Sequence, residues 1–140
     1  MKDIVVNKVQ SIQRCIRRAR EELELAGTGF REDYTRQDAA ILNITRACEQ
    51  ALDLTNHIIK THKMGIPASS RESFDLLERQ GVIPNDLAVK LRKMIGFRNT
   101  AVHQYQQLNI DIVIEIIRSG LDDLIAFTDA IIDFVDDTES

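Results

Sequence analysis

Apolar residues recur every three or four positions through most of the chain, and this spacing predicts helices that each bury one face. The first such stripe consists of Val5, Val9, Ile12, Ile16, Ala19 and Leu23. The 140 residues include only six glycines and two prolines, which leaves little turn material for a fold of many strands. Aromatic residues make up 5% of the chain, so its core must be aliphatic. We therefore predict an all-α protein.

Glycine and proline divide the pattern into five helices. The first helix is expected to end at residues 27–29, Gly-Thr-Gly, where two residues tolerate positive φ. A second helix begins near Asp33 and ends near residues 64–67, Met-Gly-Ile-Pro. Its apolar positions again recur at spacings of three and four, so it also buries one face.

The three remaining helices are marked by capping signals. Ser69 and Glu72 have the spacing of a capping box and open a short helix. Pro84 lies near the start of a fourth helix, where its missing N–H costs least, and Asn109 is the expected N-cap of the last. Four long helices and one short helix, joined by short connections, predict a single-domain antiparallel four-helix bundle over residues 1–140.

Composition and cysteine usage favour a cytoplasmic protein with no membrane association. No apolar run approaches the roughly 20 residues that cross a bilayer, and the N-terminus lacks the apolar centre of a secretory signal. Cys15 and Cys48 fall inside apolar helical patterns. We expect two buried thiols in a reduced compartment, with one disulfide as the alternative.

The sequence offers no metal or cofactor motif. His57 and His62 are five residues apart, about 140° around a helix, so they do not form the i, i+4 pair that shares a metal ion. No third ligand follows at a suitable spacing, and no glycine-rich phosphate loop is present. We therefore expect neither a metal nor a cofactor.

The net charge of −4 averages two different regions. Residues 1–108 carry +4, whereas residues 109–140 carry −8. The basic run over residues 14–20 is typical of a solvated helix face, with an RNA-binding or partner-binding surface as the alternative. Because RNA binding needs only a local basic surface, the acidic average does not exclude an RNA substrate.

The stripe of the fourth helix changes character along its length. After apolar residues at positions 87, 91 and 94, the same spacing reaches Arg98, Val102 and Tyr105. A fully buried arginine without a partner is costly. The stripe must therefore leave the core here and face a cleft or another subunit.

The segment Arg98-Asn99-x3-His103-x-Tyr105 combines groups suited to cleaving a phosphodiester. His103 can transfer a proton near neutral pH, and Arg98 can donate to phosphate oxygens. Asn99 can bond the phosphate or orient the histidine ring, and Tyr105 can stack on a base or donate a proton. No metal is required if the 2′-OH of the RNA is the nucleophile. From the composition, about 0.004 copies of R-x4-H-x-Y are expected by chance.

A structural interpretation of the same residues stays open, in which His103 caps a helix C-terminus and Arg98 pairs with an acid. Five residues on a helix place Arg98 and His103 about 140° apart, so the two converge only through a bend or a second copy of the chain. We expect a twofold arrangement to gather Arg98 and part of the basic first helix around one cleft.

The motif and its flanking segments, among them residues 47–67 and 87–105, resemble the HEPN superfamily. Within it they are similar to the HepT-like toxins encoded beside a minimal nucleotidyltransferase (MNT) antitoxin. The resemblance implies a helical bundle that forms a homodimer, with the motifs of both protomers lining a composite cleft. It also implies the toxin of a type II or type VII-like toxin–antitoxin pair that is neutralised by its MNT partner.

The activity implied by the resemblance is a metal-independent endoribonuclease that cuts RNA through the ribose 2′-OH. His103 would be the general base or acid, Arg98 the phosphate contact and Asn99 a supporting polar group. Tyr105 would be the hydroxyl to which the antitoxin transfers AMP, and the added charge would repel an RNA phosphate. The alternative is a non-catalytic substrate-binding or adaptor subunit of a nucleotidyltransferase.

Overall fold

The computed structural model describes residues 2–139, and within this range every regular element is helical. The α-helices are α1 (Lys2–Ala26), α2 (Tyr34–Thr61), α3 (Ser70–Arg79), α4 (Asn85–His103), α5 (Ile110–Glu115) and α6 (Leu121–Glu139). Two 3-10 turns, η1 (Gly27–Glu32) and η2 (Tyr105–Gln107), and a π-helical turn, η3 (Ile116–Gly120), connect them.

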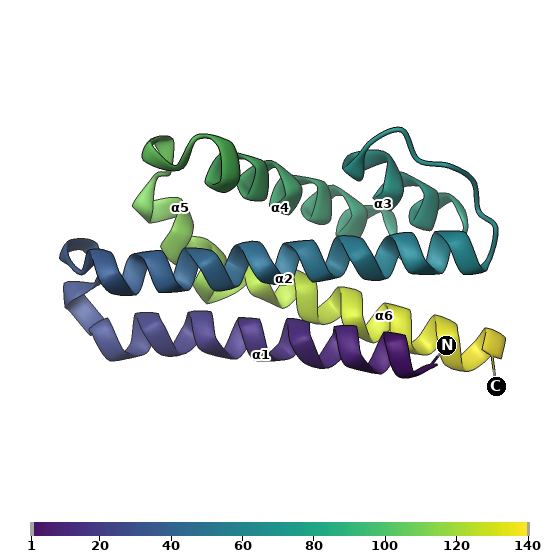
Figure 1. The fold of residues 1–140 in the computed structure, drawn as a ribbon, viewed down its shortest axis with the longest axis horizontal. Coiled ribbons are helices and arrows are strands. Elements are labelled where there is room, and N and C mark those ends of the chain that lie inside the picture. The colour runs from purple at the N-terminus through teal and green to yellow at the C-terminus, as the bar shows by residue number, and fades with distance from the viewer. Residues whose placement is uncertain (1, 140) are drawn as a thin grey trace.

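The long helices lie side by side and alternate in direction (Figure 1). Helices α1 and α2 form an antiparallel hairpin, α4 runs along the other side of α2, and α6 returns beside α1 and α2. The short α3 packs against α2 and α4 near one end. The predicted all-α bundle of four long helices and a short one is confirmed.

Side-chain caps begin three of the helices where the sequence placed them. The Asp33 carboxylate accepts a hydrogen bond from the Arg36 amide at 3.1 Å. Ser69 Oγ accepts from the Glu72 amide at 3.1 Å, and Asn109 Oδ1 accepts from the amide two residues later at 2.8 Å. Each cap satisfies one of the amide donors that a helix N-terminus leaves free.

The last helix departs from the prediction because it contains a π-helical turn. Val113, Ile117 and Leu121 follow one another at spacings of four, and an ordinary α-helix would drift about 80° over those eight residues. The wider turn at Ile116–Gly120 absorbs the drift, and all three side chains are buried.

The core is mainly aliphatic, and a few phenylalanines connect helices within it. Phe74 of α3 meets Phe127 of α6 edge to face, with ring centroids 6.0 Å apart and an interplanar angle of 81°. Both rings are buried. Cys15 and Cys48 are buried free thiols, as predicted.

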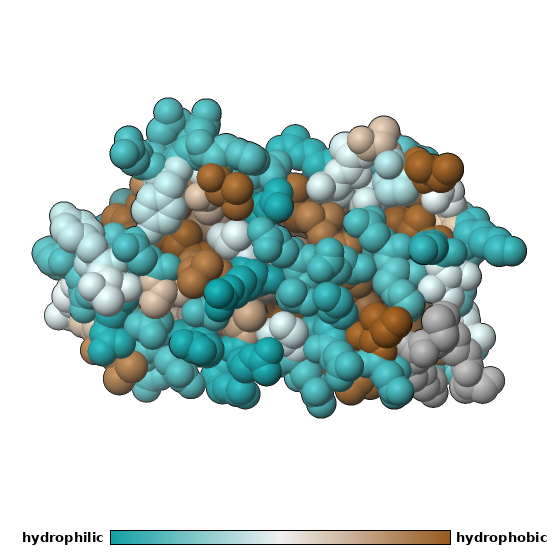
Figure 2. Space-filling view, in the orientation of Figure 1, coloured by the Kyte–Doolittle hydropathy of each residue, from teal (hydrophilic) through white to brown (hydrophobic). Residues whose placement is uncertain are grey.

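The surface follows from the same amphipathic pattern. On the face in Figure 2, polar side chains cover most of the molecule, and apolar atoms show mainly between the helices. In the part of the chain that the structure describes, no helix combines the length and the hydropathy that a membrane span requires.

Replacing Phe127 with alanine should lower the free energy of unfolding by about 3–5 kcal/mol, because it empties a buried site between α3 and α6. Urea unfolding followed by circular dichroism measures the change. The matched control is Ile132→Ala on α6, a residue that is 36% exposed and whose substitution should therefore cost clearly less than that of Phe127. Equal losses for the two variants would contradict this account of the core.

Candidate active site

The motif occupies the last two turns of α4 and the 3-10 turn that follows. Arg98 is half-buried, with 26% of its side chain exposed, and Asn99 and His103 are exposed. Val102 and Tyr105 are 47% and 44% exposed. The stripe therefore leaves the core at Arg98, as the sequence predicted.

The Arg98 guanidinium is held by two oxygen acceptors. Its Nη1 donates to Asn99 Oδ1 at 2.9 Å, and its Nη2 donates to Glu49 Oε1 of α2 at 3.4 Å. Its third donor, Nε, is buried and has no hydrogen-bond partner. A buried donor without a partner costs about 1–3 kcal/mol and calls for an explanation. An additional oxygen acceptor, such as a phosphate, would remove this cost.

The wall beside Arg98 contains two paired carboxylates. A pocket of about 340 Å³ is lined by Arg98 and by residues of α2 that include Glu49 and Asp53. Glu49 pairs with Arg98, and Asp53 pairs with Lys8 of α1 at 3.3 Å, so a phosphate that enters from that side must compete with both carboxylates for their cations. A phosphate is therefore better received from the side of Asn99 and His103, along the exposed end of α4.

Cys48 lies beneath this region but is not a nucleophile. Its Sγ donates to the Met94 carbonyl at 3.9 Å. Burial raises the pKa of the thiol to about 12, although the nearby Arg98 lowers it. The thiolate, which is the reactive form, is therefore scarce at neutral pH.

Tyr105 is connected to the start of α2. Its hydroxyl donates a hydrogen bond to Asp38 Oδ1. Burial raises the pKa of Tyr105, and the hydrogen bond to Asp38 and the charge of that carboxylate raise it further, to about 12. Both residues line an open pocket of about 400 Å³, together with Tyr34 and Gln106.

His103 is the last residue of α4. Within residues 2–139, no hydrogen bond or ion pair connects it to Arg98, Asn99 or Tyr105. The structure thus joins Arg98 to Asn99 but does not bring His103 to them. Both parts of the structural interpretation, a histidine at a helix end and an arginine paired with an acid, are present in one chain. A composite site requires a second chain.

The two carboxylates of α2 that contact the motif, Asp38 and Glu49, are not among the site residues predicted from the sequence. Asp38 is separated from Tyr105 by 67 positions, and Glu49 from Arg98 by 49. Their spacing gives one clue. The two are 11 residues apart, which is about three helical turns, so both lie on one face of α2. Nothing in the sequence says which helix meets that face.

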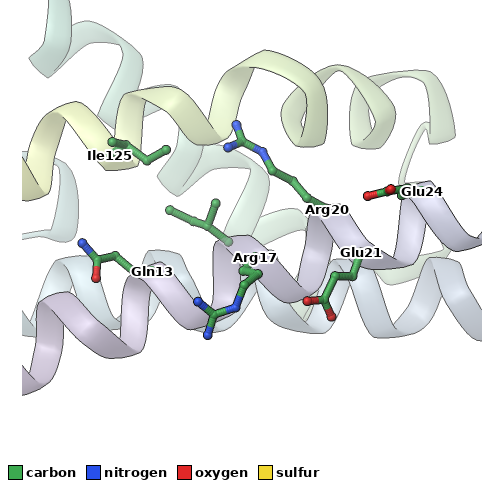
Figure 3. A pocket seen from close by; sticks show the side chains of 7 residues that line it. Gln13, Arg17, Arg20, Glu21, Glu24 and Ile125 are labelled. Carbon is green, nitrogen blue, oxygen red and sulfur yellow. The ribbon is translucent and has the colours of Figure 1, made fainter.

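The basic run on the first helix divides into exposed and paired residues. Arg14, Arg17 and Arg18 are exposed, as expected of a solvated face. Arg20 instead reaches from α1 toward η3 and the start of α6 (Figure 3). It donates to the Ile117 carbonyl at 3.2 Å and to Asp122 Oδ1 at 2.8 Å. The adjoining pocket of about 520 Å³ contains no residue of the motif.

Helix α1 and helix α4 lie on opposite sides of α2 in Figure 1. A cleft that contains both Arg98 and the exposed basic residues of α1 therefore cannot form within one chain. The gathering of these charges remains a prediction about the dimer.

Neither His57 of α2 nor His62, the residue that follows α2, belongs to a metal-ligand cluster. The His62 ring meets Phe134 edge to face, with centroids 4.9 Å apart, and His57 Nε2 is buried without a hydrogen-bond partner. Across the described residues, no three His, Cys, Asp or Glu side chains are grouped closely enough to hold a metal ion.

The chain is similar to known proteins over most of its length. A family model described as ribonuclease HepT-like matches residues 12–131. The chain is 45% identical over 131 residues to a protein of Shewanella oneidensis (strain MR-1) named mRNA nuclease HepT, covering 94% of this chain and 98% of that one.

Solved structures match equally well. One is a tri-AMPylated Shewanella oneidensis HEPN toxin in complex with MNT antitoxin, with a TM-score of 0.89 and 45% identity, covering 94% of this chain and 98% of that one. Another is a toxin–antitoxin with AMP-PNP, with a TM-score of 0.88 and 44% identity, covering 92% and 97% of the two chains. These matches confirm the predicted HEPN-like fold.

Removing the Asp38 charge should make Tyr105 easier to ionise. In a Tyr34→Phe background, which leaves Tyr105 as the one phenol, Asp38→Asn should lower the pKa from about 12 toward the ordinary value of ~10. Phenolate absorbance against pH measures it cleanly, because the chain has no Trp. The control, Asp129→Asn, changes an exposed aspartate of α6 and should not move the midpoint. An unchanged midpoint in Asp38→Asn would show that the hydrogen bond does not form.

Proposed function

The chain belongs to the family of HepT-like ribonucleases, and from this we propose that it is the toxin of a type II or type VII-like toxin–antitoxin pair. It cuts RNA as a metal-independent endoribonuclease in the cytoplasm. Its antitoxin is a minimal nucleotidyltransferase, the kind of partner present in the matching toxin complex. The substrate class is RNA, in keeping with the mRNA nuclease that the chain resembles.

The observation that carries this proposal is the environment of Arg98. An arginine occupies the place of an apolar residue in the stripe of α4, and its buried Nε has no partner. Asn99 accepts a hydrogen bond from Arg98, and His103 is exposed at the end of the same helix. A guanidinium, a side-chain amide and an imidazole are groups that suit phosphodiester cleavage once they are brought together.

In the proposed reaction the ribose 2′-oxygen attacks the adjacent phosphorus, and the bond from phosphorus to the 5′-oxygen breaks. His103 accepts the 2′-OH proton or donates a proton to the leaving oxygen. Arg98 donates to the phosphate oxygens as charge develops on them, and the Nδ2 of Asn99 supplies a further donor. The nucleophile belongs to the substrate, so no metal is needed to generate it.

A homodimer completes the site. Leu42 and Val102 are 48% and 47% exposed. Leu42 lies one turn after Asp38 on α2, and Val102 lies between Arg98 and Tyr105 on the stripe. Two hydrogen bonds from the end of α4 and the turn after it reach α2 on either side of these positions. Leu42 and Val102 therefore lie at a similar height along the bundle, among the residues of the motif and their partners. We expect them to be covered by the second protomer, which would bring its own His103 toward Arg98.

The antitoxin acts on Tyr105 in this proposal by transferring AMP to its hydroxyl. The phenol is partly exposed beside an open pocket, so an incoming nucleotide can reach it. An adenylate adds negative charge and bulk next to the RNA site and therefore opposes phosphate binding. The relative that is described as tri-AMPylated carries a modification of this kind.

A non-catalytic role as a substrate-binding or adaptor subunit of a nucleotidyltransferase is the alternative. The Arg98–Glu49 ion pair favours it, since a paired arginine can be purely structural. A purified chain that binds the nucleotidyltransferase but does not cut RNA would support this second function.

Alanine at either Arg98 or His103 should lower RNA cleavage by at least about 10²-fold, because each removes a charge-stabilising or proton-transferring group. The assay follows cleavage of cellular RNA with EDTA present, where the native chain should remain active. The matched control is Arg92→Ala on the same helix, an arginine that pairs with Asp75 outside the motif. Full activity in His103→Ala, or loss of native activity in EDTA, would contradict the mechanism.

Mixing the two inactive variants tests whether each site uses two protomers. If Arg98 and His103 act across the dimer, an equal mixture of Arg98→Ala and His103→Ala chains should regain about one quarter of native activity, because half of the dimers are mixed and each has one intact site. The variants are unfolded together, refolded and assayed on RNA. Size-exclusion chromatography confirms that dimers form. A mixture of dimers that stays inactive would contradict a site shared in this way.

A further inference from the structure

We infer that Asp38 is the general base that accepts the phenolic proton of Tyr105 during nucleotide transfer to this chain. The inference rests on the proposed function, in which Tyr105 is the acceptor of AMP, and it assigns a role to a residue outside the motif. Asp38 is on α2, whereas Tyr105 follows α4, so the fold alone brings the two together.

The direction of the hydrogen bond between Tyr105 and Asp38 suits proton transfer. The Tyr105 hydroxyl donates to Asp38 Oδ1, so its proton already points at a carboxylate oxygen. A general base must lie within hydrogen-bond reach of the proton it removes. Asp38 meets this requirement before any partner has bound.

Among the described residues, no cation pairs with Asp38, whereas Asp33, five residues earlier, pairs with Arg36. A carboxylate paired with arginine is a weaker proton acceptor, because the cation stabilises its charged form. The carboxylate of Asp38 is therefore available to the Tyr105 hydroxyl.

Both groups are accessible to a partner. Tyr105 is 44% exposed and Asp38 is also exposed. Both line the open pocket of about 400 Å³ that includes Tyr34 and Gln106. A nucleoside triphosphate held by the partner can therefore reach the hydroxyl without displacing the carboxylate.

The transfer step balances with these groups alone. Tyr105 Oη attacks the α-phosphorus of the nucleoside triphosphate, and an oxygen–phosphorus bond forms. The bond from the α-phosphorus to the bridging oxygen breaks, and pyrophosphate leaves. The phenolic proton moves to Asp38 as the new bond forms, and solvent later removes it.

Removal of the proton during attack is needed because the free phenolate is rare. With a pKa of about 12, a fraction of only ~10⁻⁵ of the Tyr105 hydroxyl is ionised at pH 7. The same carboxylate that disfavours the free phenolate can receive the proton as negative charge passes to the phosphate. Asp38 therefore acts during the attack itself.

The test compares adenylate transfer to the native chain and to Asp38→Asn, using the nucleotidyltransferase partner with ATP and intact mass as the readout. General-base catalysis contributes about 10²–10⁴-fold, and easier ionisation of the variant recovers part of this. We therefore expect a loss of about 10–10²-fold at pH 7. Transfer to the variant should also rise about tenfold per pH unit, because its phenol must ionise first, whereas the native rate should rise less steeply.

Three further variants complete the design. Asp38→Glu keeps a carboxylate and should retain more activity than Asp38→Asn, whereas Asp129→Asn should transfer at the native rate. Tyr105→Phe should gain no adenylate. Circular dichroism confirms that each variant folds.

The outcomes separate the inference from the proposed function. A native chain that gains AMP at Tyr105, with Asp38→Asn equally fast or faster, would overturn the role of Asp38 alone. A native chain that gains no adenylate, or a Tyr105→Phe chain that still does, would overturn the proposed AMP transfer and the role of Asp38 together.

Discussion

The packing of every long helix against α2 is the constraint on which the rest of the structure depends. The 28 residues of α2 span about 42 Å. They contact α1, α3, α4 and α6 through small and aliphatic side chains that are almost fully buried. Because the buried part of α2 must face several neighbours, its remaining face is narrow. Asp38 and Glu49 both lie on that face, so the packing that stabilises the bundle also presents two carboxylates to the end of α4.

The helices could be predicted from sequence because their signals are local. Ser69 and Asn109 cap helices through bonds that span two or three residues, and the stripes report burial directly. The departure of the α4 stripe from the core at Arg98 could likewise be predicted, because an arginine interrupts the apolar pattern there. The partners of Arg98 and Tyr105 could not be predicted, since Glu49 and Asp38 meet them only through the tertiary packing of α2 on α4. The only sign of the π turn at Ile116–Gly120 in the sequence is that two successive apolar spacings are both four residues. An ordinary α-helix also tolerates this over short stretches.

The charge of the chain is arranged more evenly in space than along the sequence. The acidic C-terminal region is partly neutralised by basic residues from elsewhere, since Asp122 pairs with Arg20 and Asp123 with Lys90. Asp111 pairs with Arg31 in the turn after α1. Such exposed pairs are each worth little, about 0–1 kcal/mol. The carboxylates that contact the motif, Glu49 and Asp38, come from α2 instead.

The common face of Asp38 and Glu49 has an evolutionary consequence. The contact that holds Arg98 and the contact that holds Tyr105 both lie on α2, about three helical turns apart. Inserting or deleting a single residue between positions 38 and 49 would rotate one contact by about 100° relative to the other. Lineages can therefore change loop lengths elsewhere, but this interval should keep its length. Positions 38 and 105, and positions 49 and 98, should be inherited as pairs.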